Sequence, residues 1–163
     1  MIKLGCKLKN FSLFVFICEL FFVGRSKFAP GTVASILTVL MGYYLLKNLN
    51  LIEFIIIIII LNFIAYISIE IYLKRVNEND PKEIVIDEVS GQLISLLPIL
   101  LLGIEINFQT LFYSFITFRF FDITKIGLNK IEKLQGAVGV LLDDIVAGIY
   151  SMMTQFLFWY LIS

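Results

Sequence analysis

Residues 54–69 read FIIIIIILNFIAYISI, an uncharged stretch that lies between Glu53 and Glu70. Isoleucine-rich runs favour β-strands in water. In lipid, a lone strand would leave its backbone N–H and C=O groups without partners, whereas a helix pairs them within the segment. We therefore predict a membrane helix here that extends to about Leu73.

The rest of the chain is also strongly apolar. Its 163 residues are 60% hydrophobic and have a mean hydropathy of +0.95, whereas a soluble domain is about 45–50% apolar. Further uncharged segments lie at 28–46, 89–104, 106–118 and 145–163. A full span needs about 17–25 apolar residues, so segments 89–104 and 106–118 either cross a thin region or form a hairpin that re-enters. The predicted fold is all-α, a polytopic membrane helical bundle with about four to five membrane helices.

The N-terminal segment, residues 1–27, has a basic start and a short apolar run, as a signal peptide does. Glu19 interrupts that run, and no small-residue cleavage site follows it. We expect the segment to stay in the mature protein as an amphipathic or half-buried interfacial helix. Residues 1–163 are then a single membrane-embedded domain.

Composition excludes several functions. The sequence has no histidine, which excludes histidine-based nucleophile pairs, acid–base catalysis and metal sites. Two cysteines are too few for a disulfide framework. The 13 basic and 13 acidic residues balance, so no nucleic-acid partner is expected. No obligatory protein partner is inferred; the expected partners are the membrane and a lipid.

Charge distribution gives the expected topology. With the N-terminus in the cytoplasm, Lys47 is the one residue among the 13 Lys and Arg that lies outside. The polar stretches 24–35, 80–92, 118–125 and 142–148 then all reach the cytoplasmic ends of helices. Four charged stretches at one membrane face indicate one site.

Two acidic pairs stand out, Asp87-Glu88 and Asp143-Asp144, each followed within four residues by a glycine, Gly91 or Gly148. Small residues let helices approach closely, so the pairs are predicted to face each other. Four carboxylates in one poorly hydrated place stay ionised only with a cation. Oxygen ligands suit Mg²⁺ or Mn²⁺.

The segment RFFDITK, residues 119–125, predicts a stripe of charged side chains along one helix. Arg119, Asp122 and Lys125 recur at intervals of three and share one helix face. Arginine and lysine bind phosphate, and Asp122 either positions them or joins the metal. The alternative is an interfacial ion-pair stripe without a ligand.

The segment RSKFAPGTVAS, residues 25–35, is the predicted anion cradle. Pro30-Gly31 breaks the chain just before a helix, and Thr32 and Ser35 lie at the helix start, where free N–H groups bind anions. Arg25 and Lys27 precede it. The alternative is that Thr32 and Ser35 only cap the helix.

Metal-binding carboxylates, phosphate-binding cations and an anion cradle at one membrane face indicate phosphate hydrolysis or transfer on a lipid. The rival prediction is a small ion- or proton-coupled membrane transporter that uses the intramembrane acids as a relay. A purely structural membrane subunit leaves the acidic pairs unexplained.

Four motifs in order, PGTVAS (30–35), IVIDEVSGQLI (84–94), FRFFDITK (118–125) and GVLLDDIVAG (139–148), resemble the phosphatidylglycerophosphatase A family. The resemblance implies a Mg²⁺-dependent, multi-pass lipid phosphatase of the bacterial inner membrane. Such an enzyme hydrolyses phosphatidylglycerophosphate to phosphatidylglycerol and phosphate in phospholipid biosynthesis. The family often has K-P-W-P where this chain has KIGL (125–128), and Ala34 stands where glycine is common. Every charged motif position is intact.

The predicted roles follow from the motifs and the resemblance together. The expected catalytic residues are Asp87, Glu88, Arg119, Asp122, Lys125, Asp143 and Asp144. The expected metal ligands are Asp87, Glu88, Asp143 and Asp144. The expected substrate-binding residues are Arg25, Lys27, Pro30, Gly31, Thr32 and Ser35. The attacking group is either a metal-activated water or a carboxylate that forms an aspartyl phosphate.

Overall fold

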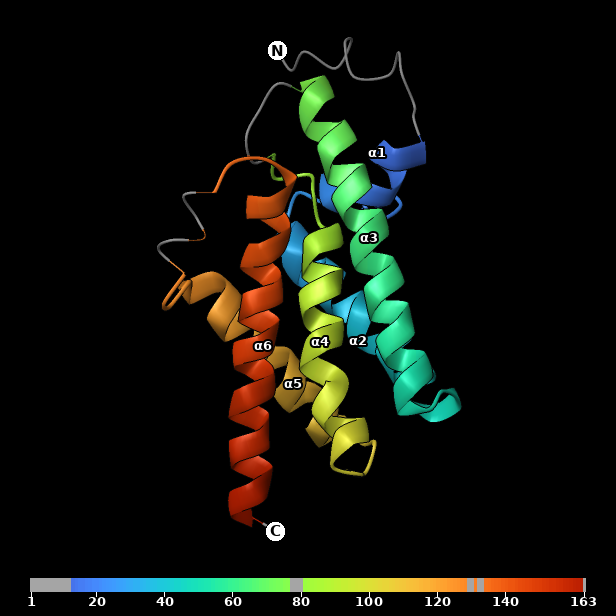
Figure 1. Ribbon diagram of the computed structural model, residues 1–163, viewed down its shortest axis with the longest axis vertical. Helices are drawn as coiled ribbons and strands as arrows, with labels where there is room; N and C mark the ends of the chain where they lie inside the picture. Colours follow the sequence, from blue (N-terminus) through green and yellow to red (C-terminus); the bar gives the residue numbers. More distant parts are fainter. Residues whose placement is uncertain (1–12, 77–80, 129–130, 132–133, 163) are drawn as a thin grey trace.

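A computed structural model describes residues 13–76, 81–128, 131 and 134–162, and every regular element in these residues is helical (Figure 1). The elements are α1 (Leu13–Cys18), a 3-10 turn η1 (Val23–Arg25), α2 (Pro30–Asn48), α3 (Leu51–Val76), α4 (Ile86–Leu101), α5 (Phe108–Thr124) and α6 (Ala137–Ile162). The all-α prediction is confirmed. The isoleucine run lies inside α3, which continues to Val76, past the predicted end near Leu73.

Local sequence explains where the helices begin. Asn50 and Glu53 exchange side-chain and backbone hydrogen bonds of 2.9 and 3.0 Å at the start of α3. Asn107 and Thr110 form the same reciprocal box at the start of α5. Such boxes satisfy backbone N–H groups that have no partner within the helix. They fix the two turns that lead out of α2 and α4.

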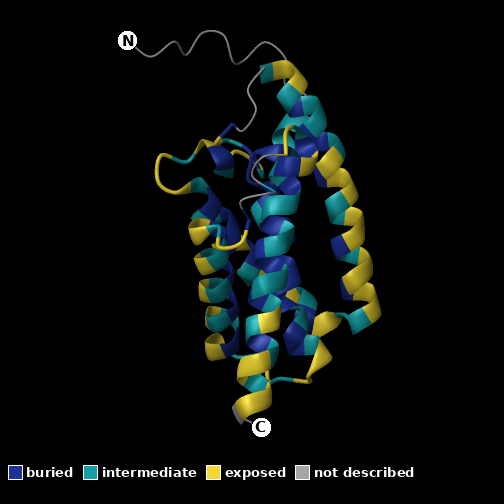
Figure 2. Cartoon of the chain, turned by 60° about the vertical axis from the view of Figure 1, so that its left-hand side comes forward, coloured by how far each residue is buried: buried dark blue, intermediate teal, exposed yellow. Residues whose placement is uncertain are grey.

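The central helix is α4, which packs against α2, α3, α5 and α6. It is buried on almost every side, as the dark blue ribbon in the middle of Figure 2 shows. Leu93, Leu96 and Ile99 of α4 meet residues such as Phe54 and Ile69 of α3 in the main apolar cluster. Gln92 and Ser95 of α4 are buried too, and they hydrogen-bond to each other and to Ser114 of α5. The short segment 89–104 therefore forms the centre of the bundle, with these buried polar side chains hydrogen-bonded to neighbours.

Glycines set the distance between α4 and α6. A Cβ added at Gly148 would lie 3.0 Å from the Cα of Gly91, and one added at Gly91 would meet the backbone of Asp144 and the ring of Phe118. The backbones of α4 and α6 therefore touch. The predicted packing role of Gly91 and Gly148 is confirmed, and the contact holds Asp144 beside the start of α4.

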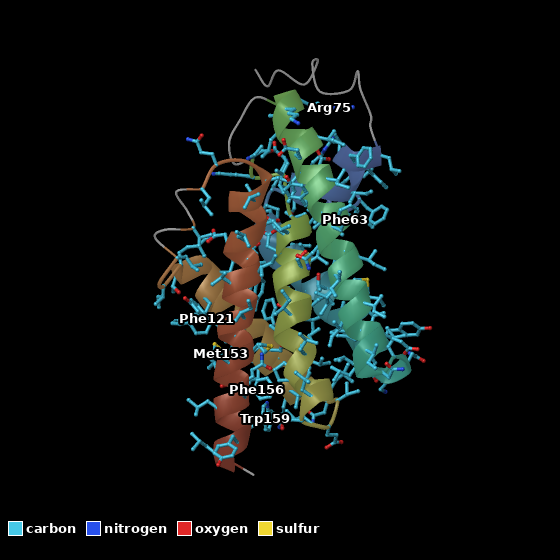
Figure 3. The ribbon with its side chains drawn as sticks, in the orientation of Figure 1. Phe63, Arg75, Phe121, Met153, Phe156 and Trp159 are labelled. Carbon is cyan, nitrogen blue, oxygen red and sulfur yellow. The ribbon has the colours of Figure 1, made fainter. Side chains whose placement is uncertain are left out.

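Two helices, α3 and α6, are long and apolar enough to cross a membrane. The outer face of α3 exposes large apolar side chains, among them Ile59 and the labelled Phe63 (Figure 3). The helices α4 and α5 have only 16 and 17 residues, as the short segments predicted. The larger count of about four to five spans stays a prediction.

The N-terminal segment packs into the bundle. Leu13 at the start of α1 is exposed, whereas Cys18 at its end is buried. The carbonyl of Cys18 accepts a 3.0 Å hydrogen bond from the N–H of Val85, just before α4. Gly24 lies against the backbone of Glu83. This segment therefore supports the entry into α4; residues 1–12 of the predicted interfacial segment lie outside the described residues.

One end of the bundle gathers the polar motifs. The helices α2, α4 and α6 begin, and α5 ends, toward the upper end of Figure 1, while the C-terminus lies at the opposite end. Figure 3 marks the same two ends by Arg75, near the end of α3, and Trp159, near the end of α6. The alternating direction of the helices thus brings distant sequence motifs together.

Candidate active site

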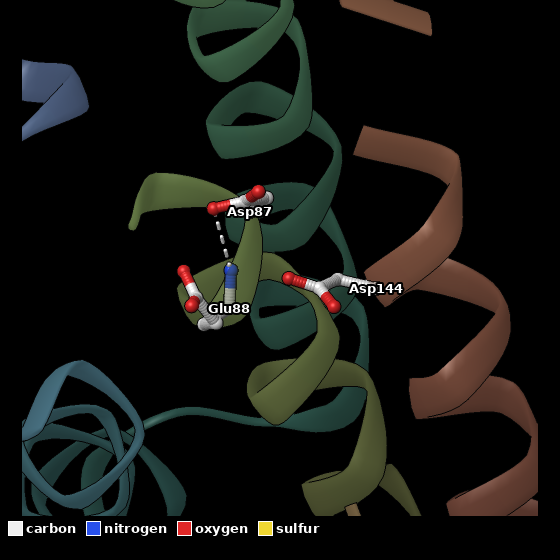
Figure 4. A group of neighbouring side chains, drawn as sticks. All are labelled: Asp87, Glu88 and Asp144. Carbon is white, nitrogen blue, oxygen red and sulfur yellow. Dashed lines mark hydrogen bonds between the residues drawn. The ribbon is translucent and has the colours of Figure 1, made fainter. Parts of the chain in front are cut away.

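Three carboxylates form the centre of the site. Asp87 and Glu88 come from α4 and Asp144 from α6, and each offers an oxygen within 4.8 Å of the others. Figure 4 shows Asp144 reaching from α6 toward the two α4 residues. Asp87 and Asp144 are only 8% and 4% exposed. The group is therefore shielded from water on most sides.

The start of α4 explains two of these positions. The apolar segment begins at residue 89, yet the helix begins at Ile86, so Asp87 and Glu88 lie in its first turn. The Asp87 carboxylate accepts a 3.1 Å hydrogen bond from the N–H of Glu88. Carboxylates are favourable at a helix N-terminus because of the helix dipole and the free N–H groups, so the acids start the helix.

The three carboxylates fit a divalent cation. Three acids this close, two of them buried and one partly buried, repel one another unless a cation joins them. The Oε2 atom of Glu88 is buried and has no hydrogen-bond partner, so it is available as a ligand. Carboxylate oxygens suit Mg²⁺, which binds through a few carboxylates and keeps several waters. The residues therefore fit the ion that the sequence suggested.

Asp143 faces elsewhere. Its Oδ2 accepts a hydrogen bond and ion pair from the Nζ of Lys125, and within the described residues it is not part of the three-carboxylate group. Neighbouring residues on a helix point about 100° apart, and here Asp144 reaches the acids of α4 whereas Asp143 pairs with Lys125 at the end of α5. Of the four carboxylates that were predicted to lie together, three form one group and the fourth, Asp143, is paired with Lys125.

The stripe on α5 and its end forms the predicted ion pairs. Arg119 pairs with Asp122, and the Lys125 Nζ lies 3.7 Å from the Asp122 Oδ1. Burial lowers the pKa of the Lys125 ammonium, but the hydrogen bond to Asp143 and the nearby acids outweigh this, and the pKa is raised. Lys125 therefore stays charged in the site.

The predicted anion cradle lies beside this stripe. The Arg119 guanidinium donates to Ser35 Oγ at 3.5 Å and to Thr32 Oγ1 at 3.4 Å. A Cβ added at Gly31 would collide with the Glu88 carboxylate and lie 3.3 Å from Arg119 Nη1. The start of α2 is therefore in direct contact with both the acids and the arginine.

Two expectations about this segment were wrong in detail. Pro30 does not break the chain before the helix but is its first residue, a position where its fixed φ and missing N–H cost nothing. Thr32 and Ser35 do not cap α2: the cap position is Ala29, without a side-chain hydrogen bond, and the Ser35 hydroxyl donates to the Gly31 carbonyl at 2.9 Å. The first N–H groups of α2 therefore have no side-chain cap.

Arg25 lies in a different cluster. It donates to the buried Glu19 carboxylate, Nε to Oε2 at 2.6 Å and a terminal nitrogen to Oε1 at 3.1 Å, and the Tyr72 hydroxyl lies 3.4 Å from the same acid. Lys27 is exposed. The structure brings neither residue onto the acidic group, so their substrate-binding role stays a prediction.

A cavity of about 730 Å³ opens over the acids. The predicted residues on its wall are Pro30, Asp87, Glu88, Asp122, Lys125, Asp143 and Asp144. Lys82 and Gln135 also line it, and the sequence analysis singled out neither. Their nearness to the acidic motifs at 87 and 143 was the available signal. The volume is typical of a small-molecule site.

Carboxylates able to hold a cation line one cavity together with Lys125, and Arg119 lies beside it, paired with the lining Asp122. Such a combination is typical of a phosphatase. Comparison with known proteins agrees: the family model described as Phosphatidylglycerophosphatase A matches residues 16–159. The chain belongs to the phosphatidylglycerophosphatase A family and is a phosphatase.

The chain is similar to two known proteins. A protein of Bacteroides thetaiotaomicron named "Putative phosphatidylinositol-3-phosphatase" is 35% identical over 135 residues, 78% of this chain and 82% of the relative. The Phosphatidylglycerophosphatase A of Haemophilus influenzae is 31% identical over 134 residues, 81% of this chain and 80% of the relative. No solved structure matches the chain.

Proposed function

We propose that this protein hydrolyses phosphatidylglycerophosphate to phosphatidylglycerol and phosphate, with Mg²⁺ as cofactor, in phospholipid biosynthesis. The observation that carries the proposal is the three-carboxylate group of Asp87, Glu88 and Asp144, in a cavity beside Arg119 and Lys125. Family membership supports the substrate. The rival prediction of a transporter has no support from the family.

The three carboxylates would hold the ion. When bound there, Mg²⁺ supplies charge for the phosphoryl oxygens and lowers the pKa of a water. Asp87 and Glu88 are fixed by the first turn of α4, and Asp144 by the glycine contact of α6. Preformed ligands need little reorganisation, which favours catalysis.

Cationic side chains would bind the substrate phosphate. Arg119 lies between Asp122 and the hydroxyls of Thr32 and Ser35, so its guanidinium is oriented before substrate arrives. Asp143 orients Lys125 in the same way. We therefore propose that Asp143 positions Lys125, in place of the predicted metal contact. The uncapped N–H groups at Gly31 and Thr32 add donors for a phosphate oxygen.

The location proposed is the bacterial inner membrane, with the site on the cytoplasmic side. The support is the pair of membrane-length helices, the exposed apolar face of α3 and the charge distribution. Residues 1–163 form one domain in this proposal, and α4 and α5 form a hairpin against α3 and α6. The acids then lie where the head group of a lipid meets water.

The name of the Bacteroides relative suggests a second substrate, phosphatidylinositol 3-phosphate. Both lipids carry a phosphate monoester on an alcohol. The substrates are therefore compared in one experiment.

The test is phosphate release by the full chain in detergent micelles. Phosphatidylglycerophosphate, phosphatidylinositol 3-phosphate and phosphatidic acid are supplied in turn, with Mg²⁺ or with EDTA. We expect Mg²⁺-dependent release that is greatest from phosphatidylglycerophosphate and about 10²–10³-fold lower in Asp144→Asn, the range that loss of one charge-stabilising group produces. Glu105→Gln, an exposed acid beyond the far end of α4, is the matched control and should keep full activity. Preference for another lipid, or full activity of folded Asp144→Asn, contradicts the proposal.

A further inference from the structure

A second hollow lies between α2 and α5. It has a volume of about 640 Å³, and its walls include Ile36, Val39 and Leu40 of α2 and Leu111, Phe112 and Phe115 of α5. Ile36, Leu40 and Phe112 are exposed. The hollow is thus an apolar groove with exposed wall residues, and its size is typical of ligand sites. We call it the α2–α5 groove.

The groove is continuous with the proposed active site on both walls. On α2, Thr32, Ile36 and Leu40 follow one another at intervals of four residues. On α5, Phe115 is four residues before Arg119. Residues four apart share a helix face, so the groove begins one turn beyond the contact between Arg119 and Thr32.

Arg119 therefore stands between two different environments. On one side lie the acidic group and its cavity, reached through Asp122 and Glu88. On the other side lies the apolar groove. A molecule that bridges them needs an anionic group at one end and a hydrocarbon chain at the other.

We propose that the α2–α5 groove holds an acyl chain of the lipid substrate while its phosphate lies at Arg119. The inference rests on the proposed function and adds where the lipid tail binds. The chain passes from lipid into the groove, so apolar transfer contributes little; close packing and placement of the phosphate contribute instead. The expected effects are therefore moderate changes in KM.

Kinetics of a matched pair of variants test this directly. Leu40→Trp fills the groove, and Ile59→Trp places the same side chain on α3, away from it; the two positions are 64% and 62% exposed. With dioleoyl phosphatidylglycerophosphate, we expect Leu40→Trp to raise KM about three- to tenfold and Ile59→Trp to leave it unchanged. With water-soluble glycerophosphoglycerophosphate, which has no acyl chains, both variants should equal the wild type.

The outcomes separate the two proposals. Equal KM values for Leu40→Trp and Ile59→Trp on the lipid overturn the groove assignment. If the wild type hydrolyses neither substrate, the proposed function is overturned. Whether the groove holds an acyl chain is then tested by measuring lipid binding.

Photolabelling measures that binding without catalysis. Phosphatidylglycerophosphate and phosphatidylcholine, each with a diazirine in one acyl chain, are incorporated into vesicles with the wild-type protein and irradiated. We expect the phosphatidylglycerophosphate probe to label the groove peptides, residues 36–43 and 108–115, more than the peptide around Ile59. Unlabelled phosphatidylglycerophosphate should displace it. If both probes label the groove equally and neither is displaced, the groove is occupied by any membrane lipid, and the assignment is overturned.

Discussion

Gly148 of α6 lies directly against Gly91 of α4, so close that a Cβ on Gly148 would stand 3.0 Å from the Gly91 Cα and closer still to its carbonyl oxygen. This backbone contact is one turn from Asp144 and one turn from Glu88. It therefore sets the distance between the two helices that supply the three carboxylates.

Gly148→Ala should separate these helices. The added methyl meets backbone, which cannot rotate away, so we expect a loss of about 1–3 kcal/mol in the free energy of unfolding and a large loss of activity. Gly42→Ala is the control, because its methyl meets the end of the flexible Leu96 side chain. Thermal unfolding and phosphate release measure both. Wild-type activity in Gly148→Ala would show that the contact does not set the site.

Substitution by asparagine should change the melting temperature in opposite directions at Asp143 and Asp144. In EDTA, Asp144→Asn removes one of three repelling carboxylates and should raise the melting temperature by about 2–4 °C, whereas Asp143→Asn takes the main partner from Lys125 and should lower it by a similar amount. Scanning calorimetry or circular dichroism gives both values. Shifts of the same sign would contradict the division between the two aspartates.

Mg²⁺ itself should stabilise the wild type. A ligand that binds only the folded state at a hundred times its Kd adds about 2.7 kcal/mol to the free energy of unfolding. We expect that gain to disappear in Glu88→Gln and Asp144→Asn but to persist in Asp143→Asn. Unfolding is followed as Mg²⁺ is titrated, with KCl of equal ionic strength as the control. If Asp143→Asn also loses the gain, Asp143 is a metal ligand after all.

Sequence reasoning predicted most of the fold, and the reason is visible in α3 and α6. Long uncharged runs have one stable form in lipid, and the alternating direction of successive helices places every charged motif at one end. The close approach of helices at Gly91 and Gly148 was also predicted from the spacing of small residues, whereas their contact with each other is a finding of the structure. What could not be predicted is rotation about the helix axis. Adjacent acids such as Asp143 and Asp144 are equivalent in the sequence, and only the packing of α6 on α4 separates them.

Arg25 shows a second limit. Its partner Glu19 is six residues away, outside helical spacing, and the intervening Leu20, Phe21 and Phe22 all have positive φ. Three consecutive apolar residues in this backbone region are rare, so no propensity predicts the turn that joins the pair. The Glu19–Arg25 pair was therefore not predicted from the sequence, and the substrate-binding role expected of Arg25 stays a prediction.

Cys18 should be chemically inert in the folded protein. Burial, followed by the nearby Asp87 and Glu19 charges, raises the pKa of its thiol to about 12, and the thiolate is the reactive form. In a Cys6→Ser variant at pH 8, we expect iodoacetamide to alkylate Cys18 only after denaturation. The control carries the exposed Lys27→Cys in a background with both native cysteines changed to serine. Rapid alkylation of folded Cys18, measured by mass spectrometry, would show that the segment opens.

The Glu19–Arg25 pair should be asymmetric. The Glu19 side chain is 4% exposed and the Arg25 side chain 34%. Without its partner, Glu19 would therefore be shielded from water, whereas Arg25 would be hydrated. Among the described residues, Arg25→Gln leaves the buried Glu19 carboxylate with the Tyr72 hydroxyl as its side-chain partner, and it should cost about 3 kcal/mol of unfolding free energy. Glu19→Gln leaves an arginine that water can reach and should cost less. The double variant should recover most of the loss, because no charge remains buried without a partner.

The same variants decide the role of Arg25. If it supports the fold alone, Arg25→Gln lowers the melting temperature but leaves KM for phosphatidylglycerophosphate unchanged, and Glu19→Gln in the same chain restores stability. If it binds substrate, KM rises in Arg25→Gln and stays raised in the double variant. Both hydrogen bonds of the Arg25 guanidinium to Glu19, and the absence of Arg25 from the described wall of the cavity, favour the first result.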